Sequence, residues 1–149
     1  MPPSANESVR LEDVTRLRLG LLRLARRLRQ QSGPDITPSQ LSVLSTLDRH
    51  GPLSHGDLAA HERIQPPTVT RIVTVMEEAG LVQRSTDPDD RRCSLVEITR
   101  DGRRRLEKIR SDRDAWLAQR LGELSPEQRR VLHQAVPVLE RLIDLGDAG

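Results

Sequence analysis

Apolar residues recur along this chain at helical spacing and predict six helices. Gaps of three and four residues between apolar positions place them on one side of a helix. The first such seam predicts a helix of about 20 residues near the N-terminus. The seam consists of Val14, Leu17, Leu21, Leu24 and Leu28. A comparable stripe near the C-terminus predicts the sixth helix, and it consists of Val131, Ala135, Val138, Leu142 and Leu145.

Capping signals mark where several helices begin. Thr37-Pro38-Ser39-Gln40 and Ser125-Pro126-Glu127-Gln128 are typical of capping boxes, in which the first and fourth residues bond reciprocally to backbone N–H groups. Ser54, followed three residues later by Asp57, predicts the start of a short third helix. Thr99 is expected to cap a long fifth helix that continues through Leu124.

The fourth helix and the segment after it have a different pattern. Gln65-Pro66-Pro67-Thr68 opens the helix, because proline fits a first turn, and Gly80 ends it. Two β-like runs, 81–86 and 93–99, then flank the turn-rich tetrapeptide Asp87-Pro88-Asp89-Asp90. We expect a β-hairpin with a charged tip.

These elements predict a mainly α fold with a small β-wing, in one domain over residues 1–149. The expected parts are a winged helix-turn-helix core over 36–99 and long dimerisation helices over 9–31 and 100–146. The terminal seams are too extensive for so small a core to cover, which predicts a two-fold dimer. The ends, residues 1–8 and 146–149, are expected to fray.

Composition removes several function classes. One Trp and no Phe or Tyr argue against binding of single strands by base stacking. A single cysteine allows no internal disulfide and no cysteine-based zinc finger. No run approaches the roughly 18 apolar residues of a membrane span, and the first ten residues lack the apolar stretch of a signal peptide. We therefore expect a soluble cytoplasmic protein without a cofactor or metal.

Charge is segregated although the net formal charge is only +2. Residues 10–29 carry seven Arg against two acids, whereas residues 30–83 carry three Arg against six acids. Residues 84–110 carry eight Arg and Lys108 against six acids. Basic character is therefore local along the chain. Arg103, Arg104 and Arg105 lie at the end of the fifth helix that the helix dipole disfavours for cations, and we interpret them as a solvated face or as intersubunit pairs.

The polar side of the fourth helix and the hairpin tip suit duplex DNA. An α-helix fits the major groove, where Thr and Arg can contact base edges or phosphate, and an Arg at a wing tip can enter the narrow minor groove. Asp90 is expected to orient one such Arg, and Arg84 can share that pairing. The candidate DNA-contacting residues are Ser54, Gln65, Pro66, Pro67, Thr68, Thr70, Arg71, Thr74, Arg84, Asp90, Arg91 and Arg92.

These residues also carry a family resemblance. The elements Val69-Thr70-Arg71, Glu77, Ala79-Gly80-Leu81-Val82, Arg84, Asp90-Arg91-Arg92 and Ile98-Thr99-Arg100-Asp101-Gly102 resemble the signature of the multiple antibiotic resistance regulator (MarR) family. The resemblance implies an obligate dimer built from the first, fifth and sixth helices, with two winged domains that bind a palindromic operator. It places the recognition helix on 66–76 and makes Arg92, rather than Arg91, the minor-groove residue.

The leading hypothesis is therefore a sequence-specific transcriptional regulator, most often a repressor in this family. A helical dimeric adaptor that uses the winged fold for protein contacts is the alternative, and salt-dependent DNA affinity distinguishes the two. An enzyme is not expected, because the chain has no HExxH, P-loop or GxSxG motif.

The resemblance also implies a possible small-molecule effector. Family members often release DNA when a small, commonly phenolic, anion binds between the winged lobe and the dimer helices. Trp116 is the only aromatic residue of this chain that could line such a site, so we expect an aliphatic pocket with Arg anchors near Leu17, Leu21, Arg49 and Trp116.

Neither the cysteine nor the histidines predict a further site. Cys93 has no second cysteine, and the hydroperoxide-sensing branch carries its thiol near the first helix, so we interpret Cys93 as structural. His50, His55 and His61 are spaced by five and six residues and do not share one helical face, which argues against a metal site.

Overall fold

The computed structural model describes residues 9–146 and divides into two compact units after Arg113. The predicted fold class, mainly helical with a small sheet, is confirmed. Residues 1–8 and 147–149, expected to fray, lie outside the described residues, whereas Gly146 is the last residue of the final helix. No helix within residues 9–146 is long and apolar enough to span a membrane.

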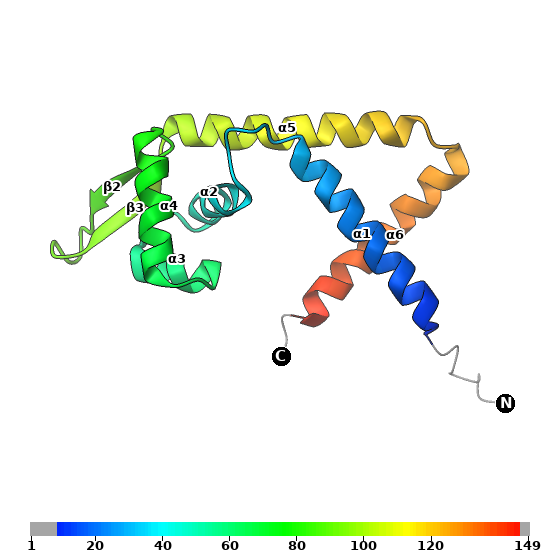
Figure 1. The fold of residues 1–149 in the computed structure, drawn as a ribbon, viewed down its shortest axis with the longest axis horizontal. Coiled ribbons are helices and arrows are strands. Elements are labelled where there is room, and N and C mark those ends of the chain that lie inside the picture. The colour runs from blue at the N-terminus through cyan, green and yellow to red at the C-terminus, as the bar shows by residue number, and fades with distance from the viewer. Residues whose placement is uncertain (1–8, 147–149) are drawn as a thin grey trace. The chain divides into compact units, whose positions relative to one another are not determined.

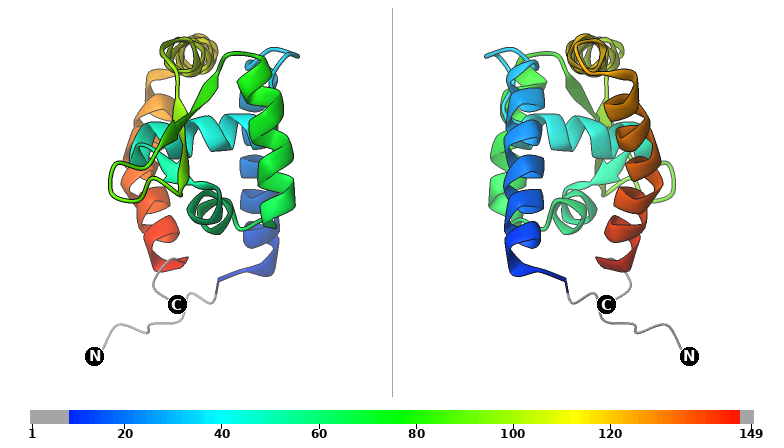
Figure 2. Two further views of the ribbon diagram at one scale, coloured as in Figure 1. Left: turned by 90° about the vertical axis from the view of Figure 1, so that its left-hand side faces the viewer. Right: turned by 90° about the vertical axis from the view of Figure 1, so that its right-hand side faces the viewer.

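The first unit contains most of the elements (Figures 1 and 2). They are α1 (Leu11–Gln30), α2 (Pro38–His50), β1 (Leu53–Ser54), α3 (His55–Glu62), α4 (Pro66–Glu78), β2 (Val82–Thr86), β3 (Ser94–Ile98) and the first half of α5 (Arg100–Gly122). The second unit contains the rest of α5 and α6 (Pro126–Gly146).

The three strands form one antiparallel sheet in the order β1-β3-β2. The predicted hairpin is confirmed, with Val82 opposite Ile98 and Thr86 opposite Ser94. Strand β1 was not predicted, because two residues, Leu53 and Ser54, are too few to show alternation; Leu53 pairs with Val96.

Helices α2, α3 and α4 pack with the sheet around one apolar core. The apolar positions of α4, at spacings of three and four, face inward: Val69, Val73 and Met76 are buried and Ile72 is half-buried. The largest fully buried side chains are Leu44, Leu47, Leu58, Met76, Leu106 and Ile109. This core holds α4 so that its opposite side is exposed.

The predicted caps are present. At α2 the Thr37 hydroxyl accepts from the Gln40 N–H at 3.2 Å, and the Gln40 side chain accepts from the Thr37 N–H at 3.0 Å. The same reciprocal pair joins Ser125 and Gln128 at α6. Helix α5 begins after Thr99 as expected but ends at Gly122, two residues before the predicted Leu124, because the chain there closes into tighter turns.

Two glycines shape the path from α4 to α5. Gly80 adopts a left-handed φ of +74°, so the Leu81 N–H can bond back to the Met76 carbonyl at 2.9 Å. Gly102 lies in the first turn of α5, where a Cβ would clash with the Leu81 carbonyl oxygen and approach Ile98. The first turn of α5 therefore packs directly on the backbone that begins the wing.

Of the three arginines at the start of α5, Arg103 and Arg104 are exposed, as expected for a solvated face, whereas Arg105 is half-buried. Arg103 and Arg110 both pair with Asp48 of α2, at 3.8 and 3.1 Å. Arg105 pairs with Asp35 at 2.6 Å and donates to the Ser32 carbonyl, so it ties α5 to the loop between α1 and α2. Arg104 pairs with Asp101 within α5. Asp48 and Asp35 lie far from their arginines in the sequence, which is why the pattern did not reveal these pairs.

The two terminal helices each present an exposed apolar side. No residue of α1, which lies entirely within the described chain, is buried, and its seam residues Val14, Leu17, Leu21 and Leu24 are 41–51% exposed. On α6 the apolar residues Val131, Val138, Leu142 and Leu145 are 52–66% exposed. Large apolar side chains in such rows mark surfaces that bind another chain.

Candidate nucleic-acid interface

The exposed side of α4 collects most of the predicted contact residues. Gln65 precedes the helix, Pro66 and Pro67 form its first turn, and all three are exposed. Thr70, Arg71 and Thr74 are exposed on the helix itself, and Thr68 is half-buried. Arg71 makes no ion pair among residues 9–146, so its guanidinium is available to guanine or phosphate.

The threonine hydroxyls of α4 are oriented by the helix backbone. Thr70 Oγ1 donates to the Pro66 carbonyl at 3.1 Å, and Thr74 Oγ1 donates to the Thr70 carbonyl at 2.8 Å. Because each hydroxyl proton is occupied, the oxygen is presented as an acceptor, and it can accept from the amino groups of adenine or cytosine. The exposed methyl groups can contact thymine.

At the hairpin tip, Asp90 holds Arg92 by two bonds. Asp90 Oδ1 accepts from the Arg92 backbone N–H at 3.0 Å and from Arg92 Nε at 3.3 Å. These bonds lower the pKa of Asp90, first through the Arg92 backbone N–H and then through its side chain. The Arg92 side chain is nevertheless 92% exposed. Asp90 therefore orients Arg92 rather than Arg91. The neighbouring Arg91 is exposed and makes no ion pair in the described chain.

Cys93 also lies beside Asp90. Its thiol is 3.6 Å from Asp90 Oδ2, and the charge of Asp90 raises the pKa of the Cys93 thiol. A raised pKa reduces the thiolate fraction, which is the reactive form. The raised pKa argues against a reactive thiol, but Cys93 is exposed rather than packed, so its structural role stays a prediction.

Two predicted contact residues are occupied elsewhere. Arg84 does not share the Asp90 pairing; its Nε bonds Glu77 of α4 at 3.1 Å, because β2 runs beside the C-terminal half of α4. Ser54 caps α3 by accepting from the Asp57 N–H, and its hydroxyl donates to the Asp57 carboxylate at 2.8 Å. These bonds leave both side chains accessible, since the Arg84 side chain is 45% exposed and Ser54 is half-buried. Both therefore stay candidate contacts beside the outer side of α4 and the hairpin tip.

His55 lies near the Arg84–Glu77 pair. Burial lowers the pKa of this half-buried imidazole, and the positive charge of Arg84 lowers it further, against a smaller opposite effect of Glu77. His50 and His61, which do not share one helix face, are brought together from α2 and α3 with ring centroids 4.3 Å apart. Within residues 9–146 no group of three or more metal-ligating side chains converges.

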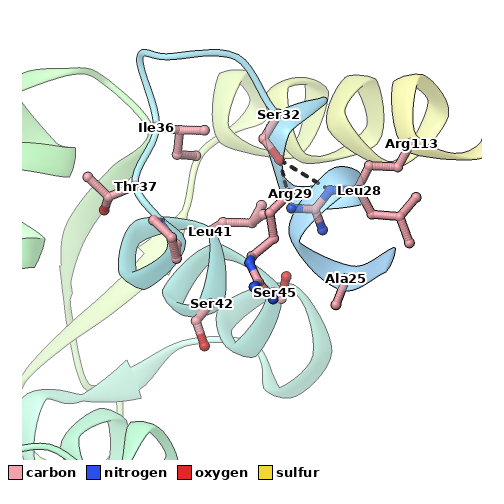
Figure 3. Close-up of a pocket in the computed structure, with 11 residues that line it drawn as sticks. Ala25, Leu28, Arg29, Ser32, Ile36, Thr37, Leu41, Ser42, Ser45 and Arg113 are labelled. Carbon is pink, nitrogen blue, oxygen red and sulfur yellow. Dashed lines mark hydrogen bonds between the residues drawn. The ribbon is translucent and has the colours of Figure 1, made fainter. Parts of the chain in front are cut away.

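A separate cavity of about 450 Å³ lies where the end of α1, the α1–α2 loop, α2 and α5 meet (Figure 3). Its wall is aliphatic and hydroxylic with two arginines, and it contains no aromatic ring. The lining residues are Ala25, Leu28, Arg29, Ser32, Ile36, Thr37, Pro38, Leu41, Ser42, Ser45 and Arg113.

The arginines of this cavity lack acidic partners. Arg113 donates from Nε and Nη2 to the Ser32 hydroxyl, at 3.1 and 2.7 Å, and Ser32 is itself buried. Burial lowers the pKa of Arg113, and the charge of Arg29 lowers it further. Neither arginine makes a salt bridge in the part of the chain that the structure describes. Two neighbouring cations without an acid favour an anion between them.

The sequence did not point to this cavity. None of the four residues predicted for an effector site, Leu17, Leu21, Arg49 and Trp116, lines it. Leu17 and Leu21 lie earlier on α1, Arg49 lies in the last turn of α2, and Trp116 lies in the second unit with Arg120 over its ring at 5.5 Å. No sequence signal could have revealed this cavity, because it depends on the burial of Ser32. Ser32 is a polar residue between two helices, and periodicity does not predict burial there.

Comparison with known proteins gives a consistent picture. Residues 36–94 match the model of the MarR family. An HTH-type transcriptional regulator of Mycobacterium tuberculosis is 36% identical over 129 residues, which cover 86% of this chain and 90% of the relative. The transcriptional repressor MdtR of Bacillus subtilis is 31% identical over 62% of this chain and 60% of its own.

Solved structures agree with these relatives. RV1404 from Mycobacterium tuberculosis superposes with a TM-score of 0.80 at 28% identity, covering 97% of this chain and 98% of that chain. A MarR family protein from Bacillus stearothermophilus gives a TM-score of 0.73 at 28% identity, covering 89% and 94%. The relatives are regulators rather than enzymes, as the missing catalytic motifs led us to expect. The chain belongs to the MarR family of DNA-binding, winged-helix transcriptional regulators.

Proposed function

We propose that this protein is a repressor that binds a palindromic operator as a homodimer. The observation that carries the proposal is the exposed Thr70–Arg71–Thr74 side of α4 together with an Arg92 that Asp90 holds at an exposed hairpin tip. A helix and a wing of this kind can read a major groove and the minor groove beside it. The proposed contacts are Ser54, Gln65, Pro66, Pro67, Thr68, Thr70, Arg71, Thr74, Arg84, Asp90, Arg91 and Arg92.

The dimer follows from the apolar sides of α1 and α6. Burying apolar area stabilises an assembly by roughly 25 cal/mol per Å², so rows of half-exposed Val and Leu favour a second copy of the chain over water. We assign dimerisation to the apolar sides of the helices within residues 9–31 and 100–146, and not to their exposed arginines. A two-fold axis then presents two recognition helices about one DNA turn apart, roughly 34–36 Å.

The names of two relatives favour repression of transcription over activation. MdtR of Bacillus subtilis and NicR of Pseudomonas putida, 31% and 37% identical to parts of this chain, are named transcriptional repressors. A MepR variant of S. aureus with the same fold was solved bound to an oligodeoxyribonucleotide. A repressor must reach chromosomal DNA, so we propose a cytoplasmic location.

We further propose that a small anion in the Arg29–Arg113 cavity releases the operator. The cavity touches the capped start of α2, at Thr37 and Pro38, and the loop that Arg105 ties to α5. An anion that draws Arg113 away from Ser32 alters the supports of the winged core. The effector site expected near Leu17, Leu21, Arg49 and Trp116 stays a prediction. Comparing the effect of anions on Arg49→Met and on Arg113→Met tests the two sites against each other.

The decisive experiment selects duplexes from a random library with the purified protein. We expect a recovered palindrome whose half-sites lie about 10 base pairs apart, a complex containing two chains of 16.8 kDa each, and affinity that falls steeply with salt. A single-chain mass in sedimentation, or affinity independent of salt, would contradict the proposal and favour the adaptor.

A further inference from the structure

One side of α1 carries four arginines that the fold does not use. Arg16, Arg23, Arg26 and Arg27, here called the arginine face, are exposed and share one side of the helix at spacings of seven, three and one. None of them makes a salt bridge within residues 9–146. Glu12 is the acid nearest to them on this side, one turn before Arg16.

The arginine face points away from the contacts that α1 makes. At 100° per residue its centre lies about 130° around the axis from the centre of the Leu17–Leu21–Leu24 seam. Ala25, Leu28 and Arg29, which reach the cavity beside α2, lie on the other side as well. The arginine face therefore stays open to solvent in the single chain and in the proposed dimer.

Its charge is unbalanced by the helix itself. Arg23 lies three residues from Arg26 and four from Arg27, and like charges at these spacings repel. The helix dipole favours cations only in the last turn, which accounts for Arg27 but not for Arg16 or Arg23. Arg23, Arg26 and Arg27, with Gln30, border a shallow hollow of about 320 Å³. Such a cluster suits anions that guanidinium can bind through paired N–H groups.

We propose that the arginine face binds the phosphate backbone of a second DNA duplex while the operator is held by α4 and the wing. This inference rests on the proposed function, which supplies the first duplex and leaves the face uncovered. From Arg16 to Arg27 the helix rises about 16 Å, the length of several successive phosphates along one strand and too long for a single small anion. A row of arginines without aromatic side chains contacts backbone rather than stacked bases, which favours a duplex over a single strand.

The test uses the full chain and the operator recovered by the selection. Biotinylated operator is immobilised, saturated with protein and washed, and a labelled duplex without the operator is then added at increasing salt. We expect the wild type to capture this second duplex. The triple variant Arg23→Gln, Arg26→Gln, Arg27→Gln should capture it at least tenfold more weakly, with a salt slope shallower by about 3. The corresponding triple Lys variant should retain most of the capture, since the charge remains.

A matched control changes three exposed arginines of α6, Arg129, Arg130 and Arg141, to Gln. The control should capture the second duplex like the wild type, and all variants should bind the operator within twofold of it. A wild type that binds operator but captures no second duplex overturns this inference and leaves the proposed function intact. Equal loss of capture in the Gln variant of the arginine face and in the Gln control variant of α6 also overturns the inference. Stronger capture of RNA than of duplex DNA does so as well. A wild type that binds no duplex at all overturns the proposed function itself.

Discussion

Asp90 accepts two hydrogen bonds from Arg92, one from the backbone N–H and one from Nε, at the tip of an otherwise exposed hairpin. The first bond closes the turn and the second fixes the side chain, so one carboxylate sets both the shape of the wing and the direction of its arginine. An acid at this position would repel phosphate if it were free, whereas the pairing makes it a support.

Replacing Arg92 with Ala should weaken operator binding roughly tenfold to a hundredfold, because a charged contact is lost. Dimer mass should not change, since Arg92 lies on the wing. Gel shift beside sedimentation measures both. Arg91→Ala is the control with the same loss of charge, and an equal effect of the two substitutions would contradict the assignment of the minor-groove contact to Arg92.

Asp90→Asn should also weaken operator binding, but less than Arg92→Ala does. The amide oxygen still accepts from the Arg92 N–H, whereas the ion pair with the Arg92 side chain is lost. The effect should vanish in an Arg92→Ala background. A double-mutant cycle measures this coupling, and additive losses would show that Asp90 does not act through Arg92.

Arg71→Ala should change specificity rather than only affinity. If Arg71 reads a guanine, its loss costs about 1–3 kcal/mol and relaxes the preference at one position of each half-site. Repeating the duplex selection with the variant reveals this as one degenerate position. A uniformly weaker but equally selective variant would instead assign Arg71 to phosphate.

Gly102→Ala should destabilise the fold by about 1–3 kcal/mol, because the new methyl group meets the Leu81 carbonyl and Ile98. Gly122→Ala, in the same helix but with nothing within 4 Å of its Cβ position, is the control. It should be neutral or slightly stabilising. Denaturant unfolding distinguishes them, and equal stability of both variants would contradict the close packing of α5 on the start of the wing.

Arg113→Met should abolish any stabilisation of the protein by small organic anions. The melting temperature without anion should fall modestly, because the buried Ser32 hydroxyl loses two donors. Thermal melts over a panel of aliphatic and aromatic carboxylates, with Arg49→Met alongside, test the cavity. Retained stabilisation in Arg113→Met and loss in Arg49→Met would favour the site predicted near Leu17, Leu21 and Trp116.

Stability should decrease as the pH falls below about 6.5, in part because of His55. Its pKa in the folded chain lies below the ordinary value of 6.5, so the unfolded chain binds the proton more readily as the pH drops through that value. The free energy of unfolding of His55→Gln should therefore fall less between pH 7.5 and 5.5. His133→Gln, which changes an exposed imidazole on α6, provides the comparison. Identical pH dependence of wild type and His55→Gln would contradict this cause.

The local patterns of the chain were enough to predict its helices, its caps and its hairpin. Capping at Thr37 and Ser125 depends on residues three positions apart, and the inward face of α4 depends on spacings of three and four, so short-range geometry decides both. The exposed Thr and Arg of α4 and the Asp90–Arg92 pair follow from the same local rules.

Only the tertiary structure decided which distant groups meet. Arg84 turned to Glu77, the start of α5 was anchored on Asp48 and Asp35, and Ser32 was buried against Arg113. No pair lies within one helix or strand, and Arg84 and Glu77 lie on β2 and α4. No helical or strand periodicity predicts contacts of this kind. The cavity and its unpaired arginines therefore arise from packing, because burial and the lack of an acidic neighbour are properties of the folded chain.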